Sequence, residues 1–333
     1  MPAGNAPGTG SRVGGGRFPL VKTKLHLHHI DPRSERFPGP QAERFPGPQA
    51  DEPPGAAPLL VILHGFLGCS ADLDAVAREA AVRSGCQALL PDLPGHGRSA
   101  HVMPVSLGHT ATLVWDAIHA HPAAKRCGSA PARVLLAGYS MGGRVALAMA
   151  HARPDVADGL FIESAHPGLT TAGDRRARAR HDTEMALRLQ RTTTKADLRA
   201  FLTDWYRQSV FLHDGRPADT FTQRVEDRLD SILPRGAPCA DLSARVAPLA
   251  AALRAHSLAA QPDFWSVPHR FGGRGWYVSG SRDHRYDDVG RRLAGNPSGV
   301  HHVPVPDAGH TVHRDAPDAY LQALQSFVTT CIS

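Results

Sequence analysis

Short runs of mainly apolar residues alternate with amphipathic patterns along much of the chain. Such runs, bounded by Gly, Pro or Asp, are typical of strands that are buried on both faces of a parallel sheet. They predict strands at 59–63, 87–91, 133–137, 159–163, 276–278 and 302–305. Helical spacing of apolar residues predicts helices at 71–84, 107–119, 144–151 and 315–328. The alternation predicts an α/β fold with a mostly parallel central sheet.

One further strand and one long interruption complete this pattern. Polar and apolar residues alternate from Phe18 to Ile30, as in a strand at the edge of a sheet. Between His166 and about Pro262, Arg-rich and Ala-rich helical patterns follow one another without a convincing strand. We therefore expect one domain over 18–333 that carries a helical cap inserted at 166–262.

Two segments are rich in Gly and Pro and predict no regular structure. Residues 1–17 contain Arg but no acidic residue, which predicts a flexible tail and loosely resembles a transit peptide. We expect a loop at 31–57, in which the eight residues Glu35–Ala42 are repeated identically at Glu43–Ala50. A tandem copy this short predicts a duplicated surface loop rather than a solenoid.

Composition and charge restrict the possible partners. The chain of 333 residues has a formal net charge of +6, with only 6% aromatic residues. Its basic residues are nearly all Arg, spread along the chain except for one cluster, Arg175, Arg176, Arg178 and Arg180. Nucleic-acid surfaces usually mix Lys and Arg with aromatic residues, whereas Arg binds small carboxylates with two parallel hydrogen bonds. We therefore expect a small anionic substrate and no nucleic acid.

The cysteine content and the hydropathy of the chain indicate in which cellular compartment to expect the protein. The five Cys residues are scattered without a Cys-x-x-Cys pair, which predicts neither a disulfide framework nor a zinc site. The sequence shows no apolar run of the roughly 20 residues that a membrane span needs, and no secretory signal. We expect a cytoplasmic protein, or a plastid protein if residues 1–17 act as a transit peptide. The sequence leaves the oligomeric state open.

The motif Gly138-x-Ser140-x-Gly142 lies between the predicted strand 133–137 and the predicted helix 144–151. In this context it is typical of a nucleophile elbow. The small glycines permit a strained turn that lifts the serine hydroxyl above the sheet at a helix N-terminus. There, backbone N–H groups can stabilise an oxyanion. Ser140 is therefore the candidate catalytic serine.

A serine near its ordinary pKa needs a base, and the base needs a carboxylate that orients it. In enzymes with a nucleophile elbow these residues follow one another along the chain in the order Ser, Asp, His. Asp283 comes after the predicted strand 276–278, and His310 comes after the predicted strand 302–305. Open α/β sheets place their sites at this carboxyl edge, so Ser140, Asp283 and His310 form the predicted triad.

The stretch His64-Gly65-Phe66 follows the first buried strand. In elbow enzymes the loop at this place supplies one backbone N–H to the oxyanion, and the residue after the serine supplies another. Phe66 and Met141 are therefore the predicted oxyanion donors, each through its backbone.

Six stretches of the chain carry a resemblance to a known family. They are Leu63-His64-Gly65-Phe66-Leu67-Gly68, Asp92-Leu93-Pro94-Gly95-His96-Gly97, Gly138-Tyr139-Ser140-Met141-Gly142-Gly143-Arg144, His166-Pro167-Gly168-Leu169, Asp204-Trp205-Tyr206-Arg207-Gln208 and Ala308-Gly309-His310-Thr311-Val312-His313-Arg314. With them the chain resembles the α/β hydrolases over about 18–333. The match is to the 2-succinyl-6-hydroxy-2,4-cyclohexadiene-1-carboxylate (SHCHC) synthases of menaquinone and phylloquinone biosynthesis.

The resemblance implies a lyase built on a hydrolase frame, with no metal or organic cofactor. Members of the family eliminate pyruvate from a tricarboxylate cyclohexene. Their triad abstracts a ring proton while the oxyanion site holds the succinyl ketone. Carried over to this chain, Arg144 and Arg178 bind substrate carboxylates, and Tyr139 and Trp205 line the pocket. Arg228 is the position that we match to a third arginine of the cap.

The chain also departs from the family pattern, and other functions fit the same triad. After Gly68 the family commonly carries an acidic residue and Trp, where this chain has Cys69-Ser70. The first alternative is a carboxylester or C–C bond hydrolase, which predicts turnover of neutral esters. The second is a small-molecule receptor on a hydrolase frame, which predicts binding with negligible turnover.

Overall fold

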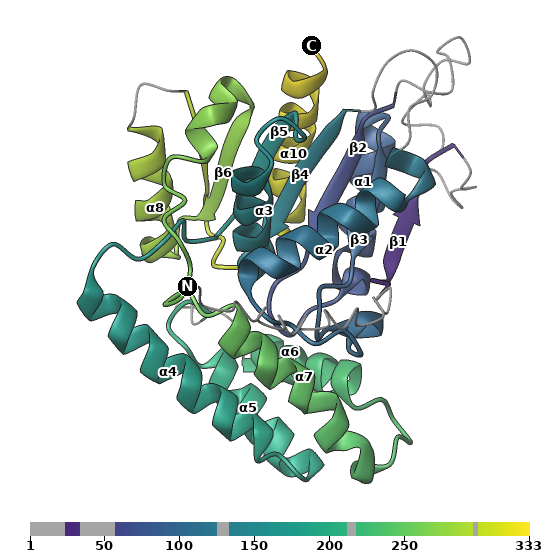
Figure 1. The fold of residues 1–333 in the computed structure, drawn as a ribbon, viewed down its shortest axis with the longest axis vertical. Helices are drawn as coiled ribbons and strands as arrows, with labels where there is room; N and C mark the ends of the chain where they lie inside the picture. The colour runs from purple at the N-terminus through teal and green to yellow at the C-terminus, as the bar shows by residue number, and fades with distance from the viewer. Residues whose placement is uncertain (1–23, 34–56, 125–132, 212–217, 296–298) are drawn as a thin grey trace, which may run out of the picture.

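Seven strands form one central sheet in the computed structural model, which describes residues 24–33, 57–124, 133–211, 218–295 and 299–333. The strands are β1 (Leu27–Ile30), β2 (Leu59–Leu63), β3 (Gln87–Pro91), β4 (Val134–Tyr139), β5 (Gly159–Glu163), β6 (Gly275–Gly280) and β7 (His301–Val305). Their order is β1-β3-β2-β4-β5-β6-β7, and all neighbours are parallel except β1 and β3. The predicted, mostly parallel sheet is confirmed (Figure 1).

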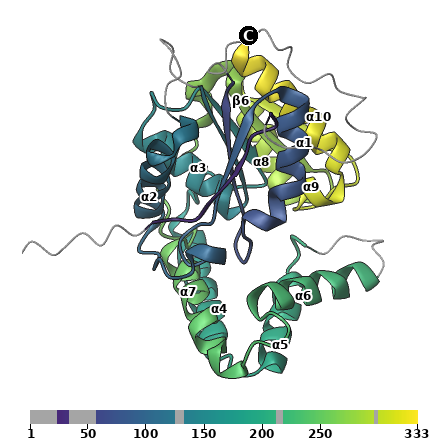
Figure 2. The ribbon, with the colours of Figure 1, turned by 90° about the vertical axis from the view of Figure 1, so that its right-hand side faces the viewer.

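Helices cover both faces of this sheet, as Figures 1 and 2 show. One face packs against α2 (Leu107–Ala120), α3 (Met141–Ala152) and α8 (His284–Ala294). The other packs against α1 (Asp74–Ser84) and α10 (Pro317–Ile332). Both faces of the central strands are therefore excluded from water.

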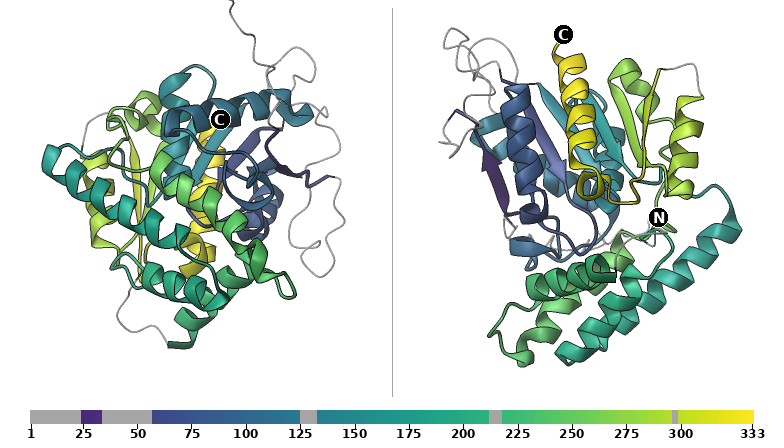
Figure 3. Two further views of the ribbon diagram at one scale, coloured as in Figure 1. Left: turned by 60° about the horizontal axis from the view of Figure 1, so that its bottom comes forward. Right: turned by 180° about the vertical axis from the view of Figure 1, so that it is seen from behind.

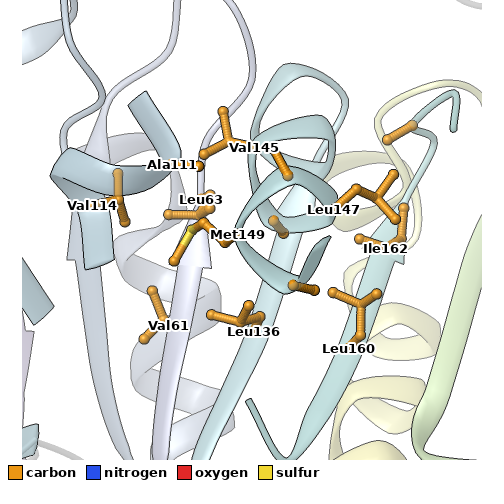
Figure 4. Close-up of a cluster of buried hydrophobic side chains, with 14 of the residues drawn as sticks. Val61, Leu63, Ala111, Val114, Leu136, Val145, Leu147, Met149, Leu160 and Ile162 are labelled. Carbon is orange, nitrogen blue, oxygen red and sulfur yellow. The ribbon is translucent and has the colours of Figure 1, made fainter. Parts of the chain in front are cut away.

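The double burial explains why the strand sequences are continuously apolar. Successive side chains of a strand point to opposite faces. In β2, Val61 and Leu63 lie in the core beneath α2 and α3 (Figure 4), whereas Leu60 and Ile62 lie in the core beneath α1 and α10. All four side chains are at most 1% exposed, so a polar residue at any of these positions would destabilise the folded protein.

Four longer helices occupy the segment for which a cap was predicted. They are α4 (Ala172–Gln190), α5 (Lys195–Tyr206), α6 (Ala218–Ile232) and α7 (Leu242–Ala255). They lie at one end of the sheet and share an apolar cluster of their own, which also includes Leu67 of the body (Figures 1 and 3). Two threonine caps, Thr171 and Thr194, accept hydrogen bonds from N–H groups in the first turns of α4 and α5. Among the described residues, no helix is both long and apolar enough for a membrane span.

Three details differ from the sequence prediction. The helix after the elbow begins at Met141 rather than Arg144, because Ser140 is its N-cap residue. Helix α8 was not predicted, since its apolar residues are few and its sequence is dominated by Arg, Asp and His. The edge strand β1 covers only the end of the predicted range 18–30, and residues 18–23 lie outside the described part. The tail at 1–17 and the repeat at 35–50 also lie outside it.

Candidate active site

The serine of the elbow has the strained backbone that its motif predicts. Ser140 lies between β4 and α3 with φ of 51° and ψ of −109°, a conformation that L residues rarely adopt. A Cβ at Gly138 would lie 2.6 Å from the backbone of Gly142, and a Cβ at Gly142 would overlap the carbonyl of Leu63. The glycines are therefore required because the turn packs directly against its own helix and against β2.

The structure brings the three predicted triad residues together. The His310 Nε2 atom lies 3.1 Å from the Ser140 Oγ atom, and the His310 Nδ1 atom lies 2.6 Å from Asp283 Oδ2. Asp283 and His310 are 4% and 3% exposed, so their hydrogen bond is shielded from water. With Nδ1–H donating to Asp283, Nε2 is free to accept the Ser140 proton, as a general base requires.

Local structure fixes both partners of the serine. Asp283 is the N-cap residue of α8, and its carboxylate also accepts from the Tyr286 N–H at 3.4 Å. The His310 ring packs against Tyr286 and Phe211, with ring centroids 4.7 and 5.4 Å away. Phe211 follows the cap helix α5, so the cap contributes directly to the environment of the base.

The loop that carries Phe66 is held by the ring of His64. The His64 Nδ1–H group donates to the Gly65 carbonyl at 2.8 Å, while Nε2 accepts from the Leu93 N–H at 3.0 Å. Burial lowers the pKa of His64, which is consistent with this neutral tautomer. The Met141 N–H lies in the first turn of α3, where backbone donors lack helical acceptors. The two N–H groups remain the predicted oxyanion donors.

A cavity opens beside Ser140, the candidate catalytic serine, and we call it the arginine cavity. It is lined by Phe66, Ser140, Met141, Arg144, Arg178, Asp182, Trp205, Ala252, Leu253 and His256. Arg144 reaches it from α3 and Arg178 from the cap helix α4, so body and cap each supply one guanidinium. Four of the predicted substrate-site and triad residues therefore share one space with the predicted oxyanion donors: Ser140, Arg144, Arg178 and Trp205.

The two guanidinium groups are held in different ways. An Arg144 Nη1–H donates to the carbonyl of His256 at 2.6 Å. Burial and the charge of Arg178 lower the pKa of Arg144 to about 10, which still leaves it charged at neutral pH. Arg178 donates through Nε to the buried Asp182 carboxylate at 2.8 Å. The cavity thus holds two guanidinium groups and one carboxylate, and this excess of positive charge favours an anionic ligand.

A second cavity, the tyrosine cavity, shares Phe66 and Trp205 with the first, and the ring centroids of these two residues are 4.9 Å apart. Its lining includes Tyr139, Tyr206, Phe211, Arg224, Arg228, Thr311 and His313. The Tyr139 hydroxyl lies 3.1 Å from the Thr311 hydroxyl, and burial raises the pKa of Tyr139. Tyr139 and Trp205 thus line cavities as predicted, but Tyr139 lines this second one.

Arg228 lies in this lining, but its contacts hold the cap to the body. Nη1–H donates to the Leu67 carbonyl at 2.6 Å, and Nη2–H donates to Asp72 at 2.9 Å. Burial alone would raise the pKa of Asp72, but the charge and hydrogen bond of Arg228 reverse this and lower it. The structure therefore does not present Arg228 as a free carboxylate receptor. Its neighbour Arg224 lies 3.7 Å from the Asp315 carboxylate and over the Tyr206 ring.

This difference gives a comparative prediction for two alanine variants. Arg228→Ala removes a cap-to-body ion pair and leaves Asp72 without it, so we expect the melting temperature to fall by about 2–6 °C. The loss should be greatest above the ordinary Asp pKa of 3.8 and shrink as the pH falls below it, because the pKa of Asp72 is lowered in the folded protein. Arg224 also faces a body carboxylate, but at 3.7 Å rather than 2.9 Å, so Arg224→Ala should raise KM with a smaller change in melting temperature. Equal thermal shifts for both variants would contradict the distinction.

Sequence reasoning missed a second buried pair of His and carboxylate next to the triad. Glu163, at the end of β5, is fully buried. Its Oε2 and Oε1 atoms lie 2.8 and 2.9 Å from the His313 Nδ1 atom. It also accepts from the His313 backbone N–H at 3.1 Å. The His313 ring packs edge-on against Tyr139, with centroids 4.9 Å apart. The available signals were His313 in the His-x-x-His motif and an acidic residue at the end of an apolar run.

Because His313 follows His310 by three residues, we expect this pair to anchor the loop of the candidate base His310. Glu163→Gln keeps the shape but removes a charge-assisted hydrogen bond worth roughly 1.5–3 kcal/mol. We expect a melting temperature about 2–4 °C lower in thermal unfolding. The exposed Glu184 of α4 offers a control, since Glu184→Gln should leave the melting temperature unchanged. A Glu163→Gln protein as stable as the parent would show that the pair does not anchor the loop.

Most of the chain matches a known family and curated relatives. The model of the alpha/beta hydrolase family matches residues 60–323. The SHCHC synthase of Klebsiella pneumoniae subsp. pneumoniae is 31% identical over 273 residues, which cover 82% of this chain and 94% of that protein. The synthase of Escherichia coli O1:K1 is 32% identical over 269 residues, which cover 80% of this chain and 92% of that protein.

Solved structures show the same fold at lower sequence identity. The structure of MenH from S. aureus superposes with a TM-score of 0.70 at 20% identity, over 92% of this chain and 99% of that one. A thermophilic esterase from Thermogutta terrifontis gives a TM-score of 0.63 at 19% identity, over 93% of this chain and 94% of that one. On the family match and the identity to the curated relatives, this chain belongs to the α/β-hydrolase family and, within it, to the SHCHC synthases.

Proposed function

We propose that the protein is a lyase that eliminates pyruvate from 2-succinyl-5-enolpyruvyl-6-hydroxy-3-cyclohexene-1-carboxylate to give SHCHC. The membership in the synthase family supports the reaction. The observation on which the proposal chiefly depends is that Ser140, hydrogen-bonded to the shielded pair of His310 and Asp283, lines the same cavity as two guanidinium groups. A triad alone would suit any ester hydrolase, whereas the arginines favour a substrate with several carboxylates.

The names of substrate and product define the bonds that change. The ring of the substrate has a double bond at position 3 and the enolpyruvyl group at position 5, and the product has double bonds at positions 2 and 4. A proton therefore leaves C2, the electron pair forms the 2,3 double bond, and the old double bond moves to 4,5. The C5–O bond breaks and releases the enolate of pyruvate, which takes up a proton.

The residues of the site match this sequence of events. His310 takes the hydroxyl proton of Ser140, and the serine oxygen then removes the C2 proton, which is acidic because the succinyl ketone is attached there. As negative charge moves onto the ketone oxygen, the N–H groups of Phe66 and Met141 stabilise it. Asp283 stabilises the imidazolium that forms on His310.

The cap and the body together bind the carboxylates in this proposal. Arg144 and Arg178 face the arginine cavity next to Ser140, and Arg224 lines the tyrosine cavity beyond Trp205. Three carboxylates that leave water need charge-assisted partners, and these three guanidinium groups supply them. The geometry thus favours Arg224 over Arg228 for the third carboxylate.

Release of pyruvate is the direct test. The purified protein is incubated with the enolpyruvyl substrate, and pyruvate is followed by a coupled reduction to lactate. We expect turnover with this substrate and a much lower kcat/KM with a neutral aryl acetate. Fast ester hydrolysis without pyruvate release would favour the ester hydrolase, and tight binding without turnover of either compound would favour a receptor.

A further inference from the structure

His256, which sequence analysis did not single out, lies in the arginine cavity with one ring nitrogen unsatisfied. The residue caps the C-terminus of α7, is 2% exposed and lines the cavity together with Ser140, Arg144 and Arg178. Its carbonyl accepts the hydrogen bond from Arg144 at 2.6 Å. It therefore contacts the residue that is expected to bind a substrate carboxylate.

The two ring nitrogens of His256 differ in their surroundings. Nε2 lies 2.8 Å from the hydroxyl of Thr110 on α2, a residue that does not line the cavity. Nδ1 is buried and has no hydrogen-bond partner among the described residues. A buried polar atom without a partner is costly, so an unpaired ring nitrogen on a residue that lines a cavity points to a group of the ligand. The other histidine near this cluster, His166, is different because its Nδ1 accepts from the Gly168 N–H at 3.1 Å.

The chemistry of His256 limits what that group can be. Burial, followed by the charges of Arg144 and His64, lowers the pKa of His256 to about 3. The imidazole is thus neutral at physiological pH and adds no attraction for an anion. Whether Nδ1 donates or accepts depends on the tautomer that Thr110 selects, and a hydroxyl group can satisfy either state. A hydroxyl is therefore the ligand group that fits in both cases.

We propose that His256 Nδ1 binds a hydroxyl of the substrate, on the carbon next to the one that bears the carboxylate held by Arg144. The site would then recognise a β-hydroxycarboxylate as a unit. The inference rests on the proposed function, because SHCHC carries its 6-hydroxyl group beside the 1-carboxylate. It adds a specificity-determining residue that distinguishes the hydroxylated ring from its deoxy analogue.

Two substitutions separate the two nitrogens of the ring. The amide of Asn reaches the position of Nδ1, and the amide of Gln reaches the position of Nε2. His256→Gln thus keeps the contact with Thr110 and empties the Nδ1 position, whereas His256→Asn does the reverse. The probes are 2-hydroxycyclohexanecarboxylate, as separate cis and trans isomers, and cyclohexanecarboxylate. Their dissociation constants are measured by calorimetry for the wild-type protein and both variants.

We expect the wild-type protein to bind one hydroxy acid about tenfold more tightly than cyclohexanecarboxylate, the usual size of one neutral hydrogen bond. His256→Asn should retain most of this preference, and His256→Gln should lose it while still binding cyclohexanecarboxylate. A preference that survives in His256→Gln, or the absence of any preference in the wild-type protein, would overturn the proposal. Failure of all three acids to bind would overturn it as well.

These outcomes are independent of the lyase reaction, because calorimetry requires no turnover. Pyruvate release by the wild-type protein tests the proposed function separately. If pyruvate is released and the hydroxyl preference is absent, His256 has no role in recognition and the lyase stands. If the preference is present without pyruvate release, the hydroxyl site stands and the reaction must be another one.

Discussion

Ser140→Ala should lower kcat/KM for the enolpyruvyl substrate by about 10³-fold or more, with the melting temperature essentially unchanged. In the proposed reaction only the oxygen that accepts a proton from C2 is lost, and loss of one member of a triad typically costs at least this much. The fold should tolerate the change, because Ala and Ser meet the same strain at a positive φ of 51°. A small residual rate should remain from the oxyanion donors and from substrate binding.

The chain provides a matched control for this variant. Ser164 follows β5, the strand next to β4, and it too has a positive φ, of 47°. Its hydroxyl is buried and has no hydrogen-bond partner in the described part of the chain. Ser164→Ala should therefore leave kcat/KM unchanged. Similar losses in both variants would mean that loss of any buried hydroxyl at this edge of the sheet perturbs the site, and that the Ser140 hydroxyl has no special role.

The elements that position the triad could be predicted from sequence because their signals are local. The apolar runs of the strands follow from burial on two faces, and the glycines around Ser140 follow from a turn that lacks room for any Cβ. Asp283 and His310 were found from chain order alone, since parallel strands bring their carboxyl ends to one edge. Helix α8 was not predicted from the sequence because charged residues dominate its exposed face.

The lining of the two cavities could not be predicted in the same way. Arg224 and Arg228 occupy one helix four residues apart, and only the packing of α6 against the body decides which one pairs with Asp72. The same holds for His256, which was one of twenty histidines until the structure placed it beside Arg144. Contacts between cap and body depend on the tertiary arrangement, for which the residue pattern carries no local signal.

Replacing either arginine of the arginine cavity by Ala should separate the lyase from an ester hydrolase. A carboxylate left without its guanidinium partner should cost roughly 2–5 kcal/mol in transition-state binding. A neutral aryl acetate has no carboxylate, so any slow hydrolysis of it should continue in Arg144→Ala and Arg178→Ala. Lys at either position should restore activity only in part, because an ammonium group cannot form two parallel hydrogen bonds. The exposed Arg176 of α4 provides the control, since Arg176→Ala should change neither activity.

Arg178→Ala should have the larger effect of the two, because it also leaves a buried charge of the wrong sign. Asp182 is 3% exposed and lines the same cavity, where Arg178 now balances its carboxylate. Without Arg178, that carboxylate would repel the substrate anion. Adding Asp182→Asn should therefore recover part of the lost kcat/KM for the enolpyruvyl substrate and leave the neutral ester unaffected. If the arginine variants reduce kcat/KM for both substrates in equal proportion, the two arginines are structural and the proposed lyase loses its main physical support.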